Sequence, residues 1–180
     1  MKFDAIDGKI LNILQTKADV SMHELGEAVE LSHTPCWRRV KKLEEQGFIK
    51  QRVTLLDPVT LDLSVNVIVN VTLRHHQEKA LERFEREVMK IEEVVECYSV
   101  SGETDFLLRV VVRNVQEYEK LLREKLIHLP EVGNLSSTFA LRQVKYTTAL
   151  PISSVELNLD SVRSQKNEDL EHAGMVADNM

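Results

Sequence analysis

The chain has 180 residues, of which 43% are hydrophobic and 29% are charged, and its formal net charge is −6. This length and balance are typical of a folded protein with two small domains, each with its own core. No apolar run approaches the roughly 20 residues of a transmembrane helix, and the N-terminus lacks the apolar core of a signal peptide. These features exclude a membrane-spanning protein, and we expect a cytoplasmic one.

Two helices are predicted near the N-terminus. Isoleucines and leucines at helical spacing mark the first, over residues 4–16. The second is expected to begin after Ser21 and to continue to about residue 30, because Ser21 and Glu24 match the capping-box pattern of a helix N-terminus. Both helices are expected to turn their apolar faces to one small core.

A third helix, over about residues 32–47, carries a dense set of basic side chains. At about 100° per residue, one side of it carries Cys36, Val40, Leu43 and Gly47. The side chains that project the opposite way are Thr34, Arg38, Lys41, Lys42 and Glu45. Three short helices with a tight turn between the last two form a helix-turn-helix, whose final helix enters the major groove of DNA. The residues expected to contact phosphates and base edges are Ser32, His33, Thr34, Pro35, Trp37, Arg38, Arg39, Lys41 and Lys42.

The distribution of charge favours nucleic acid, although the whole chain is acidic. Between Leu31 and Arg52 there are six basic residues and two acidic ones, whereas from Pro151 onward there are two basic residues and six acidic ones. A basic strand is also predicted at residues 49–55, where it would run along the DNA backbone or pair between subunits. The alternative is a solvated amphipathic helix in a generic bundle. It is disfavoured by the joint presence of the tight turn, the capped helix start and the exposed aromatic side chain.

The second half of the chain predicts a small antiparallel sheet. Asp57 and Pro58 interrupt the helical pattern and mark a domain boundary. The elements expected after it are a strand at 65–73, a helix at 81–91, strands at 94–101 and 106–112, a helix at 115–129 and a strand at 135–147. The order β-α-β-β-α-β is the ferredoxin-like plan, with both helices on one face of the sheet, so the whole chain is expected to be of the α+β class. The other face needs a cover, and we expect a homodimer.

The chain is expected to divide into three parts. They are a helix-turn-helix domain of the winged type with its linker strand at 1–62, a ferredoxin-like domain at 63–152, and a flexible or weakly helical tail at 153–180. The two cysteines, Cys36 and Cys97, lie in different predicted elements without metal-ligand spacing, so we expect buried thiols.

Residues typical of catalysis or metal binding are scarce. His75 and His76 are neighbours at a strand end, where they point in opposite directions, and no third ligand is at hand. The sequence contains no Gly-rich phosphate loop and no nucleophile elbow. We therefore expect no catalytic residue, no metal site and no enzymatic activity. The rival hypothesis is a small-molecule enzyme or effector-domain protein whose first domain is only a protein-interaction module.

Two motifs in separate domains resemble those of the Lrp/AsnC family, the feast/famine regulators of bacteria. One is the helix segment at residues 31–40 and the other is the turn at residues 100–108, with the linker at Pro58 between them. The resemblance covers about residues 3–152. Within the family, the chain most resembles the branch that responds to cysteine and switches on its breakdown. The segments that carry this closer resemblance are residues 34–39, 137–141 and 145–152.

The resemblance implies an amino-acid-sensing domain with a small-molecule site between dimers. The candidate ligand-binding residues are Gly102, Glu103, Thr104, Asp105, Ser136, Ser137 and Thr138. Asp105 is suited to pair with an α-ammonium group, while the turn amides and the hydroxyls are suited to hold a carboxylate. The alternative is that Gly102 and Asp105 only shape a hairpin. L-cysteine is the expected effector, with leucine or another small amino acid as the alternative, and no other cofactor is expected.

The sequence thus predicts an amino-acid-responsive transcriptional regulator that binds specific sites in double-stranded DNA. A cysteine-responsive activator of cysteine catabolism is the first expectation. The alternatives are a leucine-type global regulator and a nucleoid-like architectural protein that wraps DNA. The expected partners are duplex DNA, the amino-acid effector and further copies of the chain, assembled as dimers into an octamer or a similar oligomer. The expected location is the bacterial nucleoid, with no membrane contact.

Overall fold

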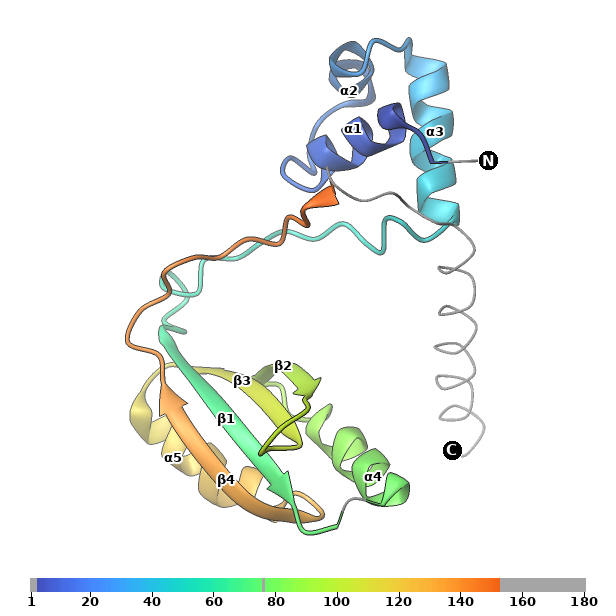
Figure 1. The fold of residues 1–180 in the computed structure, drawn as a ribbon. Helices are drawn as coiled ribbons and strands as arrows, with labels where there is room; N and C mark the ends of the chain where they lie inside the picture. Colours follow the sequence, from blue (N-terminus) through green and yellow to red (C-terminus); the bar gives the residue numbers. More distant parts are fainter. Residues whose placement is uncertain (1–2, 76, 153–180) are drawn as a thin grey trace. The chain divides into compact units, whose positions relative to one another are not determined.

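The computed structural model describes residues 3–75 and 77–152, so the predicted tail at 153–180 lies outside the described residues. The chain forms two compact units (Figure 1). Within the described range, they contain residues 3–54 with 147–152, and residues 55–146. Among the helices that the structure describes, none is long and apolar enough to cross a membrane.

Three helices surround a small core in the first unit. They are α1 (Ala5–Leu14), α2 (Met22–Ala28) and α3 (His33–Glu45). α1 is shorter than predicted, because Asp4 is its N-cap and Gln15 its C-cap. The buried hydrophobic side chains of this core are Ile10, Leu14, Val20, Leu25, Val29, Cys36, Val40 and Leu43.

Local hydrogen bonds fix how α2 begins and how it meets α3. The predicted capping box is confirmed, because the amide of Glu24 donates to Ser21 Oγ at 3.2 Å and the amide of Ser21 donates to Glu24 Oε2 at 2.9 Å. After α2 the amide of Leu31 donates to the carbonyl of Gly26 at 2.8 Å. Between them Glu30 adopts a φ of 58°, which reverses the chain. The tight turn of a helix-turn-helix results.

The second unit is a four-stranded antiparallel sheet with its helices on one face (Figure 1). In chain order its elements are β1 (Val65–Leu73), α4 (Glu78–Val88), β2 (Val94–Ser99), β3 (Phe106–Val112), α5 (Val115–Glu124), the 3-10 helix η1 (Leu126–His128) and β4 (Val132–Phe139). The strand order across the sheet is β2-β3-β1-β4. The predicted α+β class and the β-α-β-β-α-β order are confirmed.

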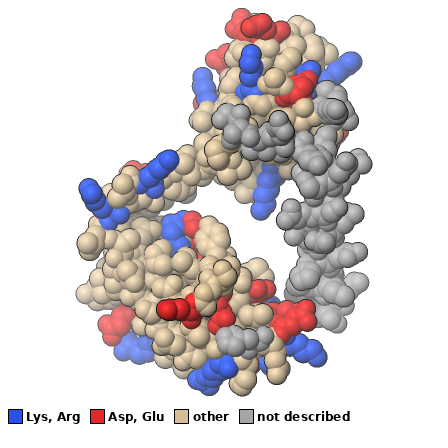
Figure 2. All heavy atoms as spheres, in the orientation of Figure 1, with Lys and Arg blue, Asp and Glu red and all other residues tan. Residues whose placement is uncertain are grey.

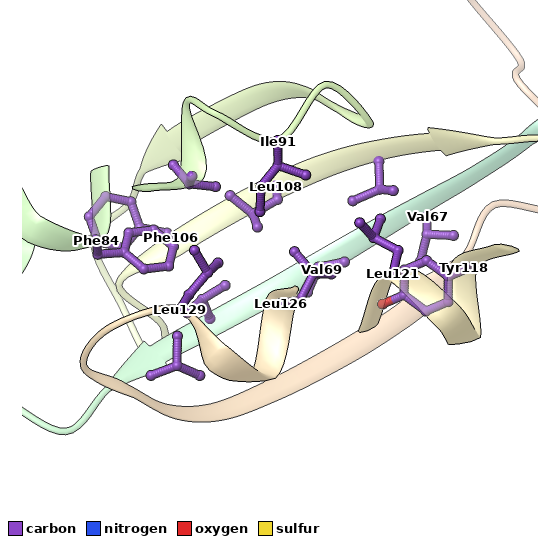
Figure 3. Close-up of a cluster of buried hydrophobic side chains, with 14 of the residues drawn as sticks. Val67, Val69, Phe84, Ile91, Phe106, Leu108, Tyr118, Leu121, Leu126 and Leu129 are labelled. Atoms are coloured by element: carbon purple, nitrogen blue, oxygen red, sulfur yellow. The ribbon is translucent and has the colours of Figure 1, made fainter. Parts of the chain in front are cut away.

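The core of this unit lies between the sheet and the helices. Side chains along β1 are alternately buried and half-buried, so every second one enters the core. Figure 3 shows Val67 and Val69 of the sheet facing Leu121 of α5. At the other end Phe84 of α4 packs on Phe106 of β3, with ring centroids 4.5 Å apart. This core shares no residue with that of the helical unit.

The last strand differs from its predicted range of 135–147. β4 pairs with β1 in antiparallel register, from Val132 opposite Leu73 to Phe139 opposite Val67. The amide of Ala140 still donates to the carbonyl of Asn66 at 2.9 Å, but β1 begins at Val65, so the residues after Ala140 have no further part of β1 to pair with. The prediction that this strand continues to residue 147 is therefore wrong.

The strand predicted at residues 49–55 is not formed within the chain. These residues follow α3 and are exposed from Lys50 onward. A strand requires a hydrogen-bonded neighbour, and the described part of the chain places none beside this segment. Pairing with the DNA backbone or with another subunit stays a prediction.

The two cysteines have different surroundings. Cys36 is buried in the helical core as predicted, but Cys97 is exposed, because it lies on β2 at the edge of the sheet. Desolvation of the sulfur, followed by the charge of Glu85, raises the pKa of the Cys97 thiol to about 11. Both thiols are reduced, and that of Cys97 is protonated at neutral pH.

Residues 147–152 return to the helical unit through Gln15. Its Nε2 donates to the carbonyl of Leu150 at 3.1 Å, and its Oε1 accepts from the Leu150 amide at 2.8 Å. The side-chain amide thus pairs with both backbone groups of Leu150, as a neighbouring strand would. This contact attaches the segment that follows β4 to the C-terminal end of α1.

Candidate nucleic-acid interface and ligand site

The outer face of α3 collects exposed polar, basic and aromatic side chains. The predicted inner stripe is confirmed for Cys36, Val40 and Leu43, which are buried, but not for Gly47, which follows the end of α3 and is exposed. On the outer side Trp37 keeps 49% of its surface exposed, although tryptophan is usually well buried. The other exposed candidates are Ser32, His33, Thr34, Pro35, Arg38 and Lys41, and Lys42 is half-buried.

This face has the chemistry of a DNA-reading surface. The Arg38 guanidinium is a planar fork of donors that matches the O6 and N7 acceptors of guanine, and Lys41 is a mobile cation suited to a phosphate. His33 and Thr34 lie at the N-terminal end of α3, which is the end that meets base edges in helix-turn-helix complexes. On the side visible in Figure 2, Lys and Arg side chains project from the helical unit into solvent.

Arg39 differs from the other basic candidates, because its guanidinium is held within the unit. Its Nη1 lies 2.7 Å from Asp4 Oδ2 and 2.8 Å from Asp7 Oδ1. The hydrogen bond to Asp7, followed by that to Asp4, raises the pKa of Arg39. Desolvation acts to raise the pKa of Asp4, but the Asp7 amide and Arg39 together lower it below its ordinary value. Sequence reasoning missed both carboxylates, although they flank the start of α1.

The turn before β3 is built around Gly102 and Asp105. Gly102 has a φ of +132°, a backbone conformation that residues other than glycine rarely adopt. The amide of Asp105 donates to the carbonyl of Val71 at 2.9 Å, and the amide of Leu73 donates to Asp105 Oδ2 at 2.7 Å. Asp105 therefore holds the turn against the end of β1. Asp105 thus has a structural role in this turn, and its pairing with an α-ammonium group stays a prediction.

The three hydroxyl residues predicted on β4 do not share a face. Ser137 is opposite the buried Val69, and its hydroxyl is hydrogen-bonded to the Tyr118 hydroxyl on the helical side. Ser136 and Thr138 are its neighbours in the strand and therefore point to the opposite face of the sheet, which the helices do not cover and which we call the open face. The alternation of side chains along a strand is enough to predict that Ser137 faces away from Ser136 and Thr138. The structure brings Ser136 and the turn to opposite sides of the end of β1, and it separates Ser137 from both.

The open face of the sheet carries a polar network that sequence reasoning missed. Arg109 of β3 lies 2.7 Å from Glu96 of β2, and its Nη1 donates to Asn66 Oδ1 at 3.1 Å. The hydrogen bond from Arg109 is the main cause of the lowered pKa of Glu96. Because the three side chains come from three strands, the network ties the open face together.

Comparison with known proteins assigns both units. Residues 3–50 match a winged helix-turn-helix DNA-binding domain, and residues 66–150 match the Lrp/AsnC ligand binding domain. The DNA-binding transcriptional activator DecR of Escherichia coli K12 is 38% identical over 149 residues, which are 83% of this chain and 98% of DecR. The chain belongs to the Lrp/AsnC family.

Other members resemble this Lrp/AsnC protein over a similar range. The leucine-responsive regulatory protein of Escherichia coli K12 is 42% identical over 151 residues, 84% of this chain and 92% of that protein. An AsnC family regulator from Agrobacterium tumefaciens is 43% identical with a TM-score of 0.80, over 83% of this chain and 97% of that one. A Neisseria meningitidis regulator solved with L-Met is 34% identical with a TM-score of 0.80, over 84% and 97%.

These matches fix the general function. This Lrp/AsnC protein is an amino-acid-responsive, DNA-binding transcriptional regulator and not an enzyme. The rival hypothesis of a small-molecule enzyme with an N-terminal interaction module is wrong.

Proposed function

We propose that this regulator reads duplex DNA with the outer face of α3 and takes L-cysteine as effector, as an activator of cysteine catabolism in the bacterial nucleoid. The observation that carries the DNA part is the pairing of a buried apolar stripe with an exposed basic and aromatic face on one helix, α3. We place the functional boundary near residue 62, with DNA binding before it and sensing after it.

Arg38→Ala is expected to weaken binding to the chain's own upstream DNA. A side chain that reads a base is worth about 1–3 kcal/mol, which is a loss of roughly five- to 150-fold in affinity. The measurement is a gel-shift titration at fixed salt. Lys9→Ala is the matched control, because Lys9 is an exposed cation on α1, outside the proposed interface. Equal affinities of Arg38→Ala and the unaltered chain would remove Arg38 from the reading set.

The effector is proposed to bind beside the turn at residues 102–105, next to Ser136 across the end of β1. A zwitterionic amino acid presents a carboxylate to the hydroxyls of Thr104 and Ser136 and to the amides of the Gly102 turn. The resemblance of residues 34–39, 137–141 and 145–152 to the cysteine-responsive branch favours cysteine. The leucine-responsive relative and the relative solved with L-Met supply the competing ligands.

A thermal-shift screen over the twenty amino acids tests the effector. A ligand that binds only the folded state raises its stability by RT ln(1 + [L]/Kd), about 2.7 kcal/mol at a hundredfold excess over Kd. We expect L-cysteine to raise the unfolding temperature most. The screen is run with a reductant, because Cys97 is an exposed free thiol.

Two cysteine analogues sharpen this screen. Cysteamine lacks the carboxylate and is expected to give no shift, while serine replaces the thiol by a hydroxyl and is expected to give a smaller shift than cysteine. A larger shift with leucine or methionine would replace cysteine as the effector. An equal shift with cysteamine would contradict the proposed carboxylate contacts.

We further propose that the open face of the sheet is covered by a second copy of the chain, and that such dimers assemble into an octamer. The support is the mixed character of this face, where Ile68, Leu107 and Val111 are half-buried around the network of Arg109. A dimer presents two copies of α3, so the operator is expected to be a pseudo-palindrome with half-sites one helical turn, or a multiple of it, apart.

A further inference from the structure

We propose that Arg39 is a positioning residue of the DNA interface: it sets the orientation of α3 on α1 through Asp4 and Asp7, and it makes no contact with DNA. The inference rests on the proposed function of α3. It assigns a role to a basic residue that stands next to Arg38 in the sequence and that, from sequence alone, is grouped with the DNA contacts.

Arg39 completes a closed set of hydrogen bonds with the carboxylates of Asp4 and Asp7. Asp4 Oδ1 accepts from the amides of Ile6 and Asp7, both at 2.9 Å, and Asp7 Oδ2 accepts from the amide of Asp4 at 3.2 Å. The remaining oxygen of each carboxylate accepts from Arg39 Nη1. All four carboxylate oxygens therefore have donors, and the capping box of α1 is at the same time the binding site for Arg39.

Burial keeps the Arg39 side chain in this position. The side chain of Asp7 is 8% exposed and that of Arg39 is 22% exposed, whereas that of Asp4 is 41% exposed. To reach a phosphate, Arg39 would have to leave the buried carboxylate of Asp7 without its cationic partner, which is strongly unfavourable. Arg38 and Lys41 are exposed instead, and none of the residues that the structure describes holds either of them in such an ion pair.

The contacts of Arg39 also fix the direction in which the outer face of α3 points. Cys36, Val40 and Leu43 attach α3 to the core through apolar contacts, which hold it in place but are non-directional. At about 100° per residue, Arg39 borders this stripe while Arg38 lies on the far side. The two contacts from one nitrogen to fixed oxygens of α1 define the rotation of α3 about its axis. That rotation decides where Arg38 and Trp37 point.

A double-mutant cycle on Arg39→Gln and Asp7→Asn tests the proposal, with DNA affinity and its salt dependence as readouts. The two hypotheses predict opposite signs for Asp7→Asn. If Arg39 positions α3, each single variant weakens binding by roughly three- to thirtyfold, and the double variant is no worse than either one. If Arg39 contacts a phosphate, Asp7→Asn releases it and tightens binding.

The salt dependence separates positioning from contact. Loss of one phosphate contact lowers the slope of log affinity against log salt by about one. We expect this change for Lys41→Gln, the matched control on the outer face of α3, and an unchanged slope for Arg39→Gln. Arg39→Lys is expected to restore much of the affinity, because a single nitrogen makes both contacts. A reduced slope for Arg39→Gln, or tighter binding by Asp7→Asn, would overturn the proposal.

Folding is controlled in the same samples. Circular dichroism gives the temperature below which each variant is fully folded, and affinities are compared there. If Asp7→Asn does not fold, Asp4→Asn replaces it in the cycle, because Asp4 is the more exposed carboxylate and bonds to the same nitrogen. An unaltered chain that binds no duplex DNA would contradict the proposed function instead, so the two failures are distinct.

Discussion

Gly26→Ala is expected to destabilise the helical unit and to abolish tight DNA binding. A Cβ at this position would lie 2.7 Å from the backbone carbonyl oxygen of Leu31. The amide of the same residue donates a hydrogen bond to the carbonyl of Gly26, so Leu31 is held close to Gly26. Overpacking of this kind costs about 1–3 kcal/mol. Alanine gains about 1 kcal/mol over glycine within a helix. The clash is expected to exceed that gain, because it is with backbone and no side chain can rotate away.

The sharper effect of Gly26→Ala is on geometry. The turn between α2 and α3 has to open to admit the methyl group, and α3 then presents its outer face in another direction. Gly8→Ala is the matched control, because its Cβ would meet only the Phe3 ring, at 3.6 and 3.7 Å, which is ordinary contact. We expect the two alanine variants to change the unfolding temperature in opposite directions. Unchanged DNA affinity in Gly26→Ala would show that the turn tolerates a side chain.

Phe84→Ala is expected to cost about 3–5 kcal/mol of the free energy of unfolding. Phe84 has no exposed surface and packs on Phe106, so its removal leaves a cavity at the α4 end of the core of the second unit. Domains of this kind are stable by only about 5–15 kcal/mol, so the loss is a large fraction of the total. The helical unit has a separate core, and we expect it to be affected less.

Denaturant unfolding followed by circular dichroism measures this loss. Val115→Ala is the control, because Val115 belongs to the same unit but is 53% exposed, and surface changes are usually within about 0.5 kcal/mol. A loss below about 1 kcal/mol for Phe84→Ala would mean that the core closes around the cavity, contrary to the close packing that the structure shows.

Features with a local cause were predictable from the sequence. The capping box at Ser21 involves residues three apart, and the buried stripe of α3 follows from the helical repeat. The order of strands and helices in the sensing unit follows from similar repeats. By contrast, the end of β4 is decided by where β1 begins, and the exposure of Cys97 by the position of β2 at the sheet edge. Both depend on neighbours remote in sequence.

The candidate sites divide in the same way. The outer face of α3 could be drawn from periodicity alone, but the partners of Arg39 lie 32 and 35 residues before it. No local pattern joins them. Ser137 is a different case, because strand alternation already separates it from Ser136. The family resemblance, and not the strand pattern, groups the three adjacent hydroxyl residues in one site. The structural use of Asp105 required knowledge of its bond to Leu73.

The central claim is that a small amino acid controls DNA binding by α3. Fluorescence anisotropy of the chain with a labelled duplex of its own upstream region, at two salt concentrations and with each amino acid in turn, tests this claim most directly. We expect salt-dependent binding whose affinity changes with L-cysteine and changes less with the other amino acids. Binding that is the same with every amino acid as with none, or the absence of binding at either salt concentration, would contradict it.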